Sequence, residues 1–220
     1  MKVVVFLGPS LPWDEARRIL PRAKYCPPAG RGDLAAVADE DFNAIGLIDG
    51  VFYQRPAVAP REILFALERG VLVVGGSSMG ALRAAELHSY GMVGVGRIYE
   101  WYREGIINSD DEVALVFHPD SYRALSEPLV NVRATLEALT ERGILDSNER
   151  EVLIAATKEI PFQLRNHMRI VQVAMQKGLD KQRSRMILRA LGKWRVDQKK
   201  LDAQEVLKEL RSLEPERQEG

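Results

Sequence analysis

Short apolar runs alternate with amphipathic stretches over the first 120 residues of the chain. The runs are rich in Val, Ile and Leu, as buried strands are, and they cover residues 3–7, 44–48 and 71–74. Patterns with a helical period follow them, over 12–20, 60–69 and 81–90. Strands separated by helices predict a parallel sheet built from right-handed βαβ units. A further apolar run, 113–117, is predicted to form a fourth strand.

From residue 127 onward the pattern has a helical period throughout. Helices are predicted over 127–142, 147–157, 161–177, 180–191 and 202–212. The fold class that follows is α/β: a small, mostly parallel, Rossmann-like sheet with flanking helices, followed by an all-helical C-terminal region. We therefore expect two domains, an α/β core over 1–126 and a helical region over 127–220.

Composition narrows the possible functions. The 220 residues contain one cysteine, Cys26, which excludes an intrachain disulfide and a metal site built from several cysteines. We predict no metal and no cofactor. No apolar run reaches the roughly 18–20 residues that span a bilayer, and the run at 3–7 is too short for a signal sequence. These features predict a cytoplasmic protein that does not associate with membranes.

Charge divides the chain. Residues 1–150 carry 16 Lys and Arg against 21 Asp and Glu, so the remaining 70 residues carry 15 against 10. The basic residues are densest over 177–200. This stretch could dock an anionic partner, either nucleic acid or an acidic protein, or it could be the solvated face of amphipathic helices. Trp194 is its only aromatic residue, which makes nucleic-acid binding the weaker interpretation.

Polar and small residues follow each of the three predicted strands. Gly8-Pro9-Ser10 follows the first, Asp49-Gly50 the second, and 75–80 the third. Ligands of such sheets bind beyond the carboxyl ends of the strands, so Ser10 and Asp49 are predicted to line a ligand site. Asp49 could equally form a local turn through its own backbone.

The segment Gly76-Ser77-Ser78-Met79-Gly80 fits the pattern G-x-S-x-G between a strand and a helix. In that context Ser78 is a candidate nucleophile, and Ser77 with the amides near Met79 and Gly80 would bind substrate and stabilise an oxyanion. The alternative is a turn in which Ser77 or Ser78 caps the helix.

Arg83 lies one turn further along the predicted helix. It could bind an anionic substrate or pair with Glu86, three residues on. The glycine-rich segment lacks the lysine and the spacing of a P-loop, so nucleotide binding is not predicted.

A serine nucleophile needs a base, and the sequence offers two kinds. His118 follows the predicted fourth strand and would reach the edge of Ser78 if that strand is parallel. Asp111 and Glu112 precede the strand and could activate a water molecule. A strand over 113–117 would separate the two groups by about 20 Å, so only one of them can face Ser78. The sequence leaves this choice open.

Taken together, these segments resemble the TfuA-like family over about residues 3–135. The most specific stretch is Ser77-Ser78-Met79-Gly80-Ala81-Leu82-Arg83-Ala84-Ala85-Glu86-Leu87. It is supported by Phe6-Leu7-Gly8-Pro9-Ser10, Ile48-Asp49-Gly50 and Asp110-Asp111-Glu112-Val113-Ala114. The chain departs from the family pattern at Pro60-Arg61, where a His-Lys pair is expected.

The resemblance implies a partner of YcaO enzymes in peptide backbone thioamidation, a post-translational modification used in RiPP biosynthesis. It implies recruitment of a ubiquitin-like sulfur-carrier protein and hydrolysis of its C-terminal thiocarboxylate, which releases sulfide. A non-catalytic adaptor that docks the carrier to YcaO is the alternative, and a nucleic-acid-binding protein is a further one. The sequence does not give the oligomeric state.

Overall fold

A computed structural model describes residues 1–53 and 55–213, and the chain divides into two compact units. The α/β unit comprises residues 1–110 and the C-terminal segment from Lys199, whereas the helical unit comprises Asp111–Gln198. The sequence predicted an α/β sheet followed by helices, and this fold class is confirmed. The α/β unit differs from the predicted core in taking its last helix from the far end of the chain.

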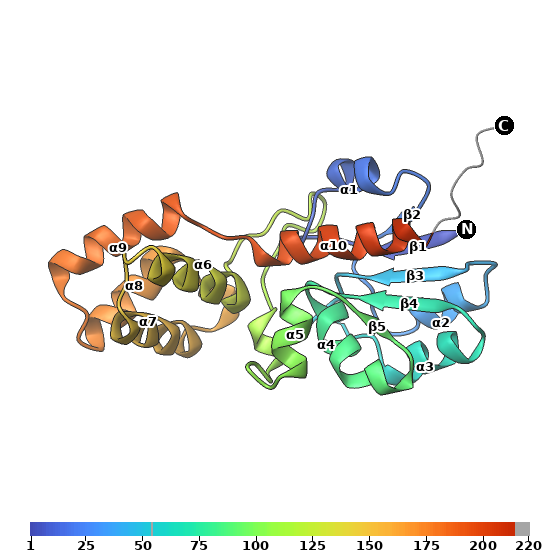
Figure 1. Cartoon of the computed structure of the whole chain (residues 1–220), viewed down its shortest axis with the longest axis horizontal. Helices are drawn as coiled ribbons and strands as arrows, with labels where there is room; N and C mark the ends of the chain where they lie inside the picture. Colours follow the sequence, from blue (N-terminus) through green and yellow to red (C-terminus); the bar gives the residue numbers. More distant parts are fainter. Residues whose placement is uncertain (54, 214–220) are drawn as a thin grey trace. The chain divides into compact units, whose positions relative to one another are not determined.

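The five strands of the α/β unit form one sheet in the order β2-β1-β3-β4-β5 (Figure 1). They are β1 (Val3–Phe6), β2 (Lys24–Cys26), β3 (Ala44–Leu47), β4 (Leu72–Gly75) and β5 (Val93–Gly94). Every pairing is parallel, as predicted. Phe6 pairs with Leu47, and Leu47 with Gly75, so the segments that follow β1, β3 and β4 start at one edge. The strand order reverses between β1 and β3, where such sheets form their ligand crevice.

Helices cover both faces of this sheet. They are α1 (Trp13–Ile19), α2 (Asp33–Ala38), α3 (Pro60–Glu68), α4 (Met79–Leu87), α5 (Arg97–Arg103) and α10 (Gln198–Ser212). Figure 1 shows α1 and α10 on one side of the sheet and α2, α3 and α4 on the other. The sheet is therefore doubly wound, as a parallel sheet with both faces buried must be.

Helix α10 is held against the sheet by an apolar stripe. Its four inward residues recur at helical spacing and are fully buried: Ala203, Val206, Leu207 and Leu210. They pack with side chains of β1, β3 and α1. A β-carbon on Gly76 would lie 2.7 Å from Val206, so the missing side chain at Gly76 lets the helix approach the sheet closely.

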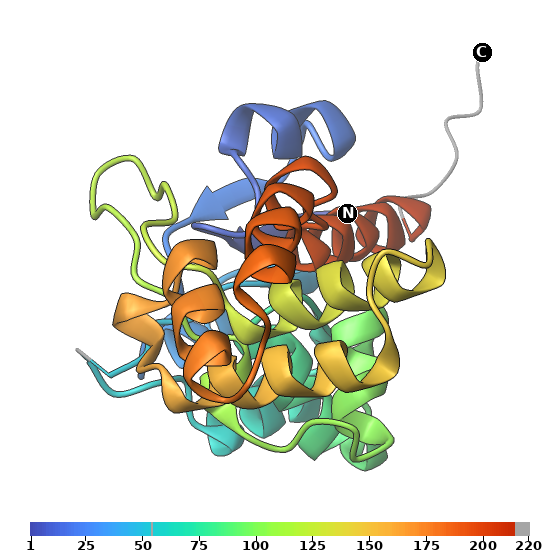
Figure 2. The same cartoon turned by 90° about the vertical axis from the view of Figure 1, so that its left-hand side faces the viewer.

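The helical unit is built from α6 (Leu129–Glu141), α7 (Ser147–Glu159), α8 (His167–Gln176) and α9 (Lys181–Lys193), which Figure 2 shows grouped together. Their buried stripes share one core, which includes Leu136, Leu153, Ile170 and Ile187. Three of the helices begin at N-cap side chains that accept backbone N–H groups, namely Asp146, Asn166 and Asp180. The predicted helices of this region are thus confirmed, apart from shifts at their ends.

The predicted strand over 113–117 is wrong. The backbone turns back on itself instead: Leu125 N–H donates to Val116 O at 2.7 Å, and His118 N–H donates to Arg123 O at 2.9 Å. The segment is apolar because Val113 and Ala114 are buried, although neither residue joins the sheet. The strand on the outer side of β4 is β5, which is only two residues long.

The sequence also missed β2, α2 and α5. Each is short, and β2 is a three-residue edge strand that begins with an exposed lysine. Such elements carry too few residues for a periodic pattern. No helix within residues 1–53 and 55–213 is both long and apolar enough to cross a membrane.

Candidate functional site

Asp49 joins two loops between β1 and β3, where the strand order reverses. Its carboxylate accepts hydrogen bonds from Gly8 N–H (2.9 Å), Ser10 N–H (3.0 Å) and the Ser10 hydroxyl (2.6 Å). Asp49 is 1% exposed and Ser10 is 4% exposed. The sequence predicted these two residues at one edge, and the structure brings them into direct contact. The carboxylate therefore fixes the loop after β1 against the end of β3.

A buried lysine faces this carboxylate from α10. The Lys199 ammonium lies 3.9 Å from Asp49 Oδ1, and both side chains are almost fully buried. Sequence reasoning missed this residue, because Lys199 belongs to a basic stretch in which every lysine looks like a surface residue. Only the packing of α10 on the sheet brings it to Asp49.

The turn between β4 and α4 contains a strained serine. Ser77 has a φ of 67°, a left-handed conformation that costs an L-residue roughly 1–2 kcal/mol. Its side chain is fully buried, and its hydroxyl donates a hydrogen bond of 2.8 Å to the carbonyl oxygen of Lys199. The hydroxyl of Ser77 is thus used to hold the turn against α10.

Ser78 differs from its neighbour. It starts α4 without capping the helix through its side chain, so the capping interpretation does not apply to it. Its hydroxyl makes no hydrogen bond to any residue within 1–53 and 55–213. Ser78 is 6% exposed, less than a nucleophile projecting from the sheet edge would be. Among the described residues, Arg150 Nε is the only side-chain N or O atom that has neither a hydrogen-bond partner nor contact with solvent. The Ser78 hydroxyl also has no partner but is not in this class. The Ser78 oxygen therefore keeps some contact with solvent.

The amides after Ser78 are not equivalent. Gly80 N–H donates to Ile48 O at 3.3 Å and is therefore occupied. A β-carbon at Gly80 would overlap the carbonyl oxygen of Leu47, so this glycine allows α4 to pack on β3. The Met79 N–H has no acceptor among the described residues. Of the two predicted oxyanion donors, Met79 is thus the one that remains available.

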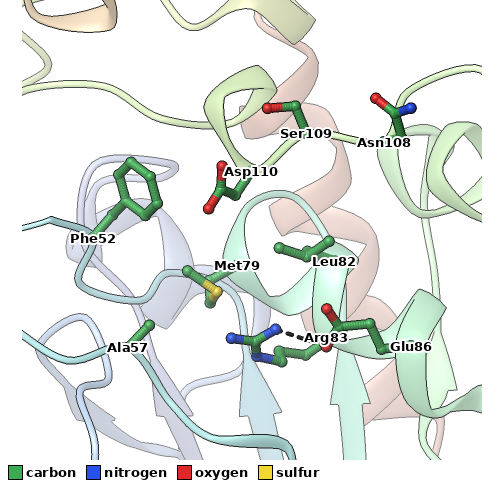
Figure 3. Close-up of a pocket in the computed structure, with 9 residues that line it drawn as sticks. All are labelled: Phe52, Ala57, Met79, Leu82, Arg83, Glu86, Asn108, Ser109 and Asp110. Carbon is green, nitrogen blue, oxygen red and sulfur yellow. Dashed lines mark hydrogen bonds and ion pairs between the residues drawn. The ribbon is translucent and has the colours of Figure 1, made fainter.

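A pocket of about 590 Å³ lies beside this turn within the α/β unit. Figure 3 shows its lining, which comes from the start of α4 and from the loops that follow β3 and α5. The lining residues are Phe52, Ala57, Met79, Leu82, Arg83, Glu86, Asn108, Ser109 and Asp110. Met79 belongs both to the serine turn and to the pocket, so it connects the two.

Arg83 is the cation of this pocket. Its Nε donates to Val58 O at 2.9 Å and its Nη1 pairs with Glu86 at 2.6 Å, so the predicted pair with Glu86 forms. Its side chain is 15% exposed. Nη2 makes no hydrogen bond to a described residue. Figure 3 shows the guanidinium near Met79 and Ala57, with Asp110 and Ser109 on the opposite side of the pocket. An anion in the pocket could therefore still bind Arg83.

The three adjacent carboxylates of 110–112 have separate roles. Asp110 lines the pocket of the α/β unit. Asp111 pairs with the buried Arg165, and Glu112 accepts two hydrogen bonds from Arg133, at 2.7 and 2.8 Å. Both of the carboxylates that were predicted as candidate bases are thus engaged by arginines within the helical unit.

A model of the TfuA-like protein family matches residues 49–166, just over half of the chain. The chain belongs to the TfuA-like family. The matched segment runs from Asp49 through Ser78 and Arg83 into the helical unit, whereas Ser10 and Lys199 lie outside it. Membership of the TfuA-like family supports a role in the YcaO-associated thioamidation system. Comparison with curated proteins gave no match.

The histidines of this TfuA-like chain lie on different elements. His118, the predicted base, is exposed on a loop of the helical unit, and its Nδ1 accepts a hydrogen bond of 3.3 Å from Asp120 N–H. The strand that was expected to carry it to the sheet edge does not form. His88 is exposed just after α4, where a short 3₁₀ turn begins.

Helix α9 presents the basic residues of this TfuA-like chain. Four of them repeat every fourth residue on its exposed side, namely Lys181, Arg185, Arg189 and Lys193. We call this set the α9 basic strip. None of the four forms an ion pair with a residue within 1–53 and 55–213. Arg183, by contrast, turns inward and binds Glu149 through two hydrogen bonds of 2.6 Å.

Metal ligands do not gather anywhere in the described part of the chain. No group of three or more His, Cys, Asp or Glu side chains within residues 1–53 and 55–213 is placed to hold an ion. Cys26 is half-buried in β2, and burial raises the pKa of its thiol. A thiol with a raised pKa is a poor nucleophile at neutral pH.

Proposed function

We propose that this TfuA-like chain binds the thiocarboxylate tail of a ubiquitin-like sulfur carrier and hydrolyses it, providing sulfide to a YcaO enzyme. Family membership supports the thioamidation context, whereas the carrier and the hydrolysis are our proposal. The observation that carries it is the unpartnered Ser78 hydroxyl next to a free amide, with Arg83 in the adjoining pocket. These are the parts that an acyl-transfer site requires.

The pocket suits the end of a peptide chain that carries an anion. Arg83 would bind the terminal thiocarboxylate or a nearby carbonyl through Nη2. Asp110 and Asn108 provide acceptors for the peptide N–H groups of the tail. Carrier tails of this kind end in Gly-Gly, and a chain without side chains would pass Met79 toward Ser78.

The reaction balances without a cofactor. The Ser78 oxygen attacks the carbonyl carbon, the carbon–sulfur bond breaks, and the hydroxyl proton leaves with the sulfur as hydrosulfide. Water then hydrolyses the serine ester to a carboxylate and a proton, which regenerates the hydroxyl. The Met79 N–H would stabilise the oxyanion of each tetrahedral intermediate. Hydrosulfide is a good leaving group, so the first step needs little acid catalysis.

The base of this reaction stays a prediction: His118 is one candidate, and arginines already engage the carboxylates of Asp111 and Glu112. A water molecule activated at either carboxylate is the alternative. The variants His118→Ala, Asp111→Asn and Glu112→Gln separate the two. The base is the residue whose loss lowers kcat on the order of 100-fold while the circular dichroism spectrum stays unchanged.

Sulfide release from a thiocarboxylated carrier tests the hydrolysis. Ser78→Ala should lower the rate at least about 100-fold, because the nucleophile is lost. Ser89→Ala is the matched control: it removes an exposed serine hydroxyl just after α4, outside the turn. Mass spectrometry of quenched wild-type reactions should detect the carrier esterified to Ser78. Release by Ser78→Ala at the wild-type rate would exclude this serine as the nucleophile.

Carrier binding tests the pocket. Arg83→Met should raise KM roughly 10- to 100-fold, the effect of losing a charge-assisted hydrogen bond. Arg61→Met is the control, because Arg61 is an exposed residue of α3 that does not line the pocket. Equal KM values for the two variants would exclude a role of Arg83 in binding the tail.

A non-catalytic adaptor is the second candidate function, and the α9 basic strip favours it. Like charges four residues apart destabilise a helix by roughly 0.2–0.5 kcal/mol per pair, and the strip contains no acidic residue to offset this repulsion. An acidic protein surface would remove the cost, and exposed Met186 beside the strip would add apolar contact. The zero net charge of the chain disfavours a long polyanion such as nucleic acid.

Charge reversal distinguishes the adaptor from the hydrolase. An adaptor would release no sulfide by itself, yet it would bind a YcaO enzyme, and Arg185→Glu with Arg189→Glu would weaken that binding. Lys158→Glu, on the exposed side of α7, is the control. Binding that is insensitive to both variants and to salt would exclude the strip as the docking surface. Salt-sensitive binding of RNA or DNA instead would assign the strip to nucleic acid.

A further inference from the structure

We propose that Lys199 is a positioning residue for the Ser78 turn and that α10, which lies outside the family-matched segment, is a required part of the reaction centre. The effect of Lys199 on sulfide release rests on the proposed function. The structural content of the proposal is independent of that function: one residue holds the loops that follow β1 and β4.

The location of Lys199 is unfavourable on general grounds. Lysine is almost never fully buried unless it is paired, and a cation at the start of a helix opposes the helix dipole. Yet Lys199 is 2% exposed in the first turn of α10. The next residue, Lys200, pairs with Glu15 at 2.8 Å and is half-buried. The burial of Lys199 therefore does not follow from the general character of this helix.

What Lys199 contacts explains its position. Its ammonium lies 3.9 Å from Asp49, whose carboxylate binds the loop after β1 through Gly8 and Ser10. Its carbonyl oxygen accepts the hydrogen bond of Ser77, the strained residue of the turn after β4. The side chain and the backbone of one residue thus fix the two loops on either side of the β3 end.

A second contact fixes α10 itself. The fully buried Asp202 accepts a hydrogen bond of 2.7 Å from Ile98 N–H in the first turn of α5. A β-carbon on Gly96 would lie 2.6 Å from this carboxyl group, so the chain is shaped around it. The start of α10 is therefore anchored through polar groups at Asp49, Ser77 and Ile98, in addition to the pair of Lys200 with Glu15 at the surface. This precise anchoring is what a turn that presents a hydroxyl and an amide requires.

Three variants test the role of Lys199. Lys199→Met removes the charge at similar length, and Lys200→Met is the matched control on the same turn. Lys199→Met should lower kcat for sulfide release on the order of 100-fold, the effect of a misplacement near 1 Å, with KM changed less. The double variant Asp49→Asn with Lys199→Met removes both charges. It should recover stability in urea unfolding, because no unpaired charge stays buried, without recovering kcat.

Hydrogen exchange provides a readout that does not need the hydrolase. The hydrogen-bonded amides of Gly8 and Ser10, and those of Gly76 and Ser78, should exchange at least tenfold faster in Lys199→Met than in Lys200→Met, while the amides of α7 stay unchanged. This result would hold even if the wild type released no sulfide, which would refute the proposed function alone. Unchanged exchange in both loops would overturn the positioning role. So would a kcat that recovers together with stability in the double variant, because that behaviour indicates a purely structural lysine.

Discussion

The hydroxyl of Ser77 donates a 2.8 Å hydrogen bond to the carbonyl oxygen of Lys199, 122 residues further along the chain. The two residues belong to the turn after β4 and to the last helix of the fold. The bond is buried, so it holds the turn in a left-handed conformation that serine does not favour by itself. The serine motif and the C-terminal helix are therefore one structural unit.

Substitutions at Ser77 should separate the hydrogen bond from the backbone strain. Ser77→Ala loses the bond and keeps the strain, so it should lower the free energy of unfolding by about 1–2 kcal/mol. Ser77→Gly loses the same bond but adopts positive φ without cost, so its loss should be smaller by about 1 kcal/mol. Urea unfolding of both variants measures the difference. Equal losses would mean that the φ of 67° stores no strain.

Gly80 should tolerate no side chain. Its β-carbon would overlap the carbonyl oxygen of Leu47, which forces α4 away from β3. Gly80→Ala should therefore destabilise the chain by about 2 kcal/mol or more, as overpacking against backbone does. Thermal unfolding followed by circular dichroism measures the effect.

Gly192→Ala is the control for this substitution. Gly192 also lies in a helix, α9, but a β-carbon there would meet nothing within 4 Å. This variant should gain roughly 0.5–1 kcal/mol, because alanine loses less backbone entropy than glycine in a helix. A gain of stability at both positions would mean that the contact with Leu47 costs less than the helix preference of alanine contributes.

The spacing of hydrophobic residues was sufficient to predict the helices and strands that are long or fully buried. The runs containing β1, β3 and β4, and the helices from α6 to α9, could be predicted because several residues repeat one pattern. The run from Val113 to Phe117 was misread, since its apolar residues are buried in the helical unit and its backbone bonds to the returning loop. A local pattern records that a residue is buried but not which partner buries it.

The site could be predicted only in part for a related reason. The contact between Ser10 and Asp49 follows from parallel topology, because both residues come just after paired strands. Lys199 has no such signal: it lies among exposed lysines, and its partner Asp49 is far away in the sequence. Tertiary packing of α10 alone brings it to Asp49.

Arg165 should be essential for the stability of the helical unit. This arginine is 1% exposed, and its guanidinium donates to the carbonyl oxygens of Thr157, Ile160 and Asp111 as well as to the Asp111 carboxylate. Arg165→Met would leave these acceptors without their donor, at a cost of about 3 kcal/mol. Arg169→Met, at an exposed position of α8, should change the free energy of unfolding by less than about 0.5 kcal/mol. Similar unfolding midpoints for the two variants would contradict this role.

His167 should make stability depend on pH. Burial lowers the pKa of its imidazole, and Arg195 lowers it further, while Glu127, at 3.9 Å, acts in the opposite direction. The folded state therefore binds fewer protons at His167 than the unfolded state does, between the lowered pKa and the ordinary value of 6.5. Its contribution to stability is complete above pH 6.5 and is lost as the pH falls through the lowered pKa.

Urea unfolding at a series of pH values from 7.5 to 5 tests this dependence. The free energy of unfolding should fall across the range in the wild type and fall less steeply in His167→Gln, which cannot take up the proton. His88→Gln controls for the loss of a histidine, because His88 is exposed on the turn after α4. The same pH slope in the wild type and in His167→Gln would mean that Glu127 offsets burial and Arg195 completely. A slope of the opposite sign would mean that the pair with Glu127 dominates and that His167 is protonated in the folded chain.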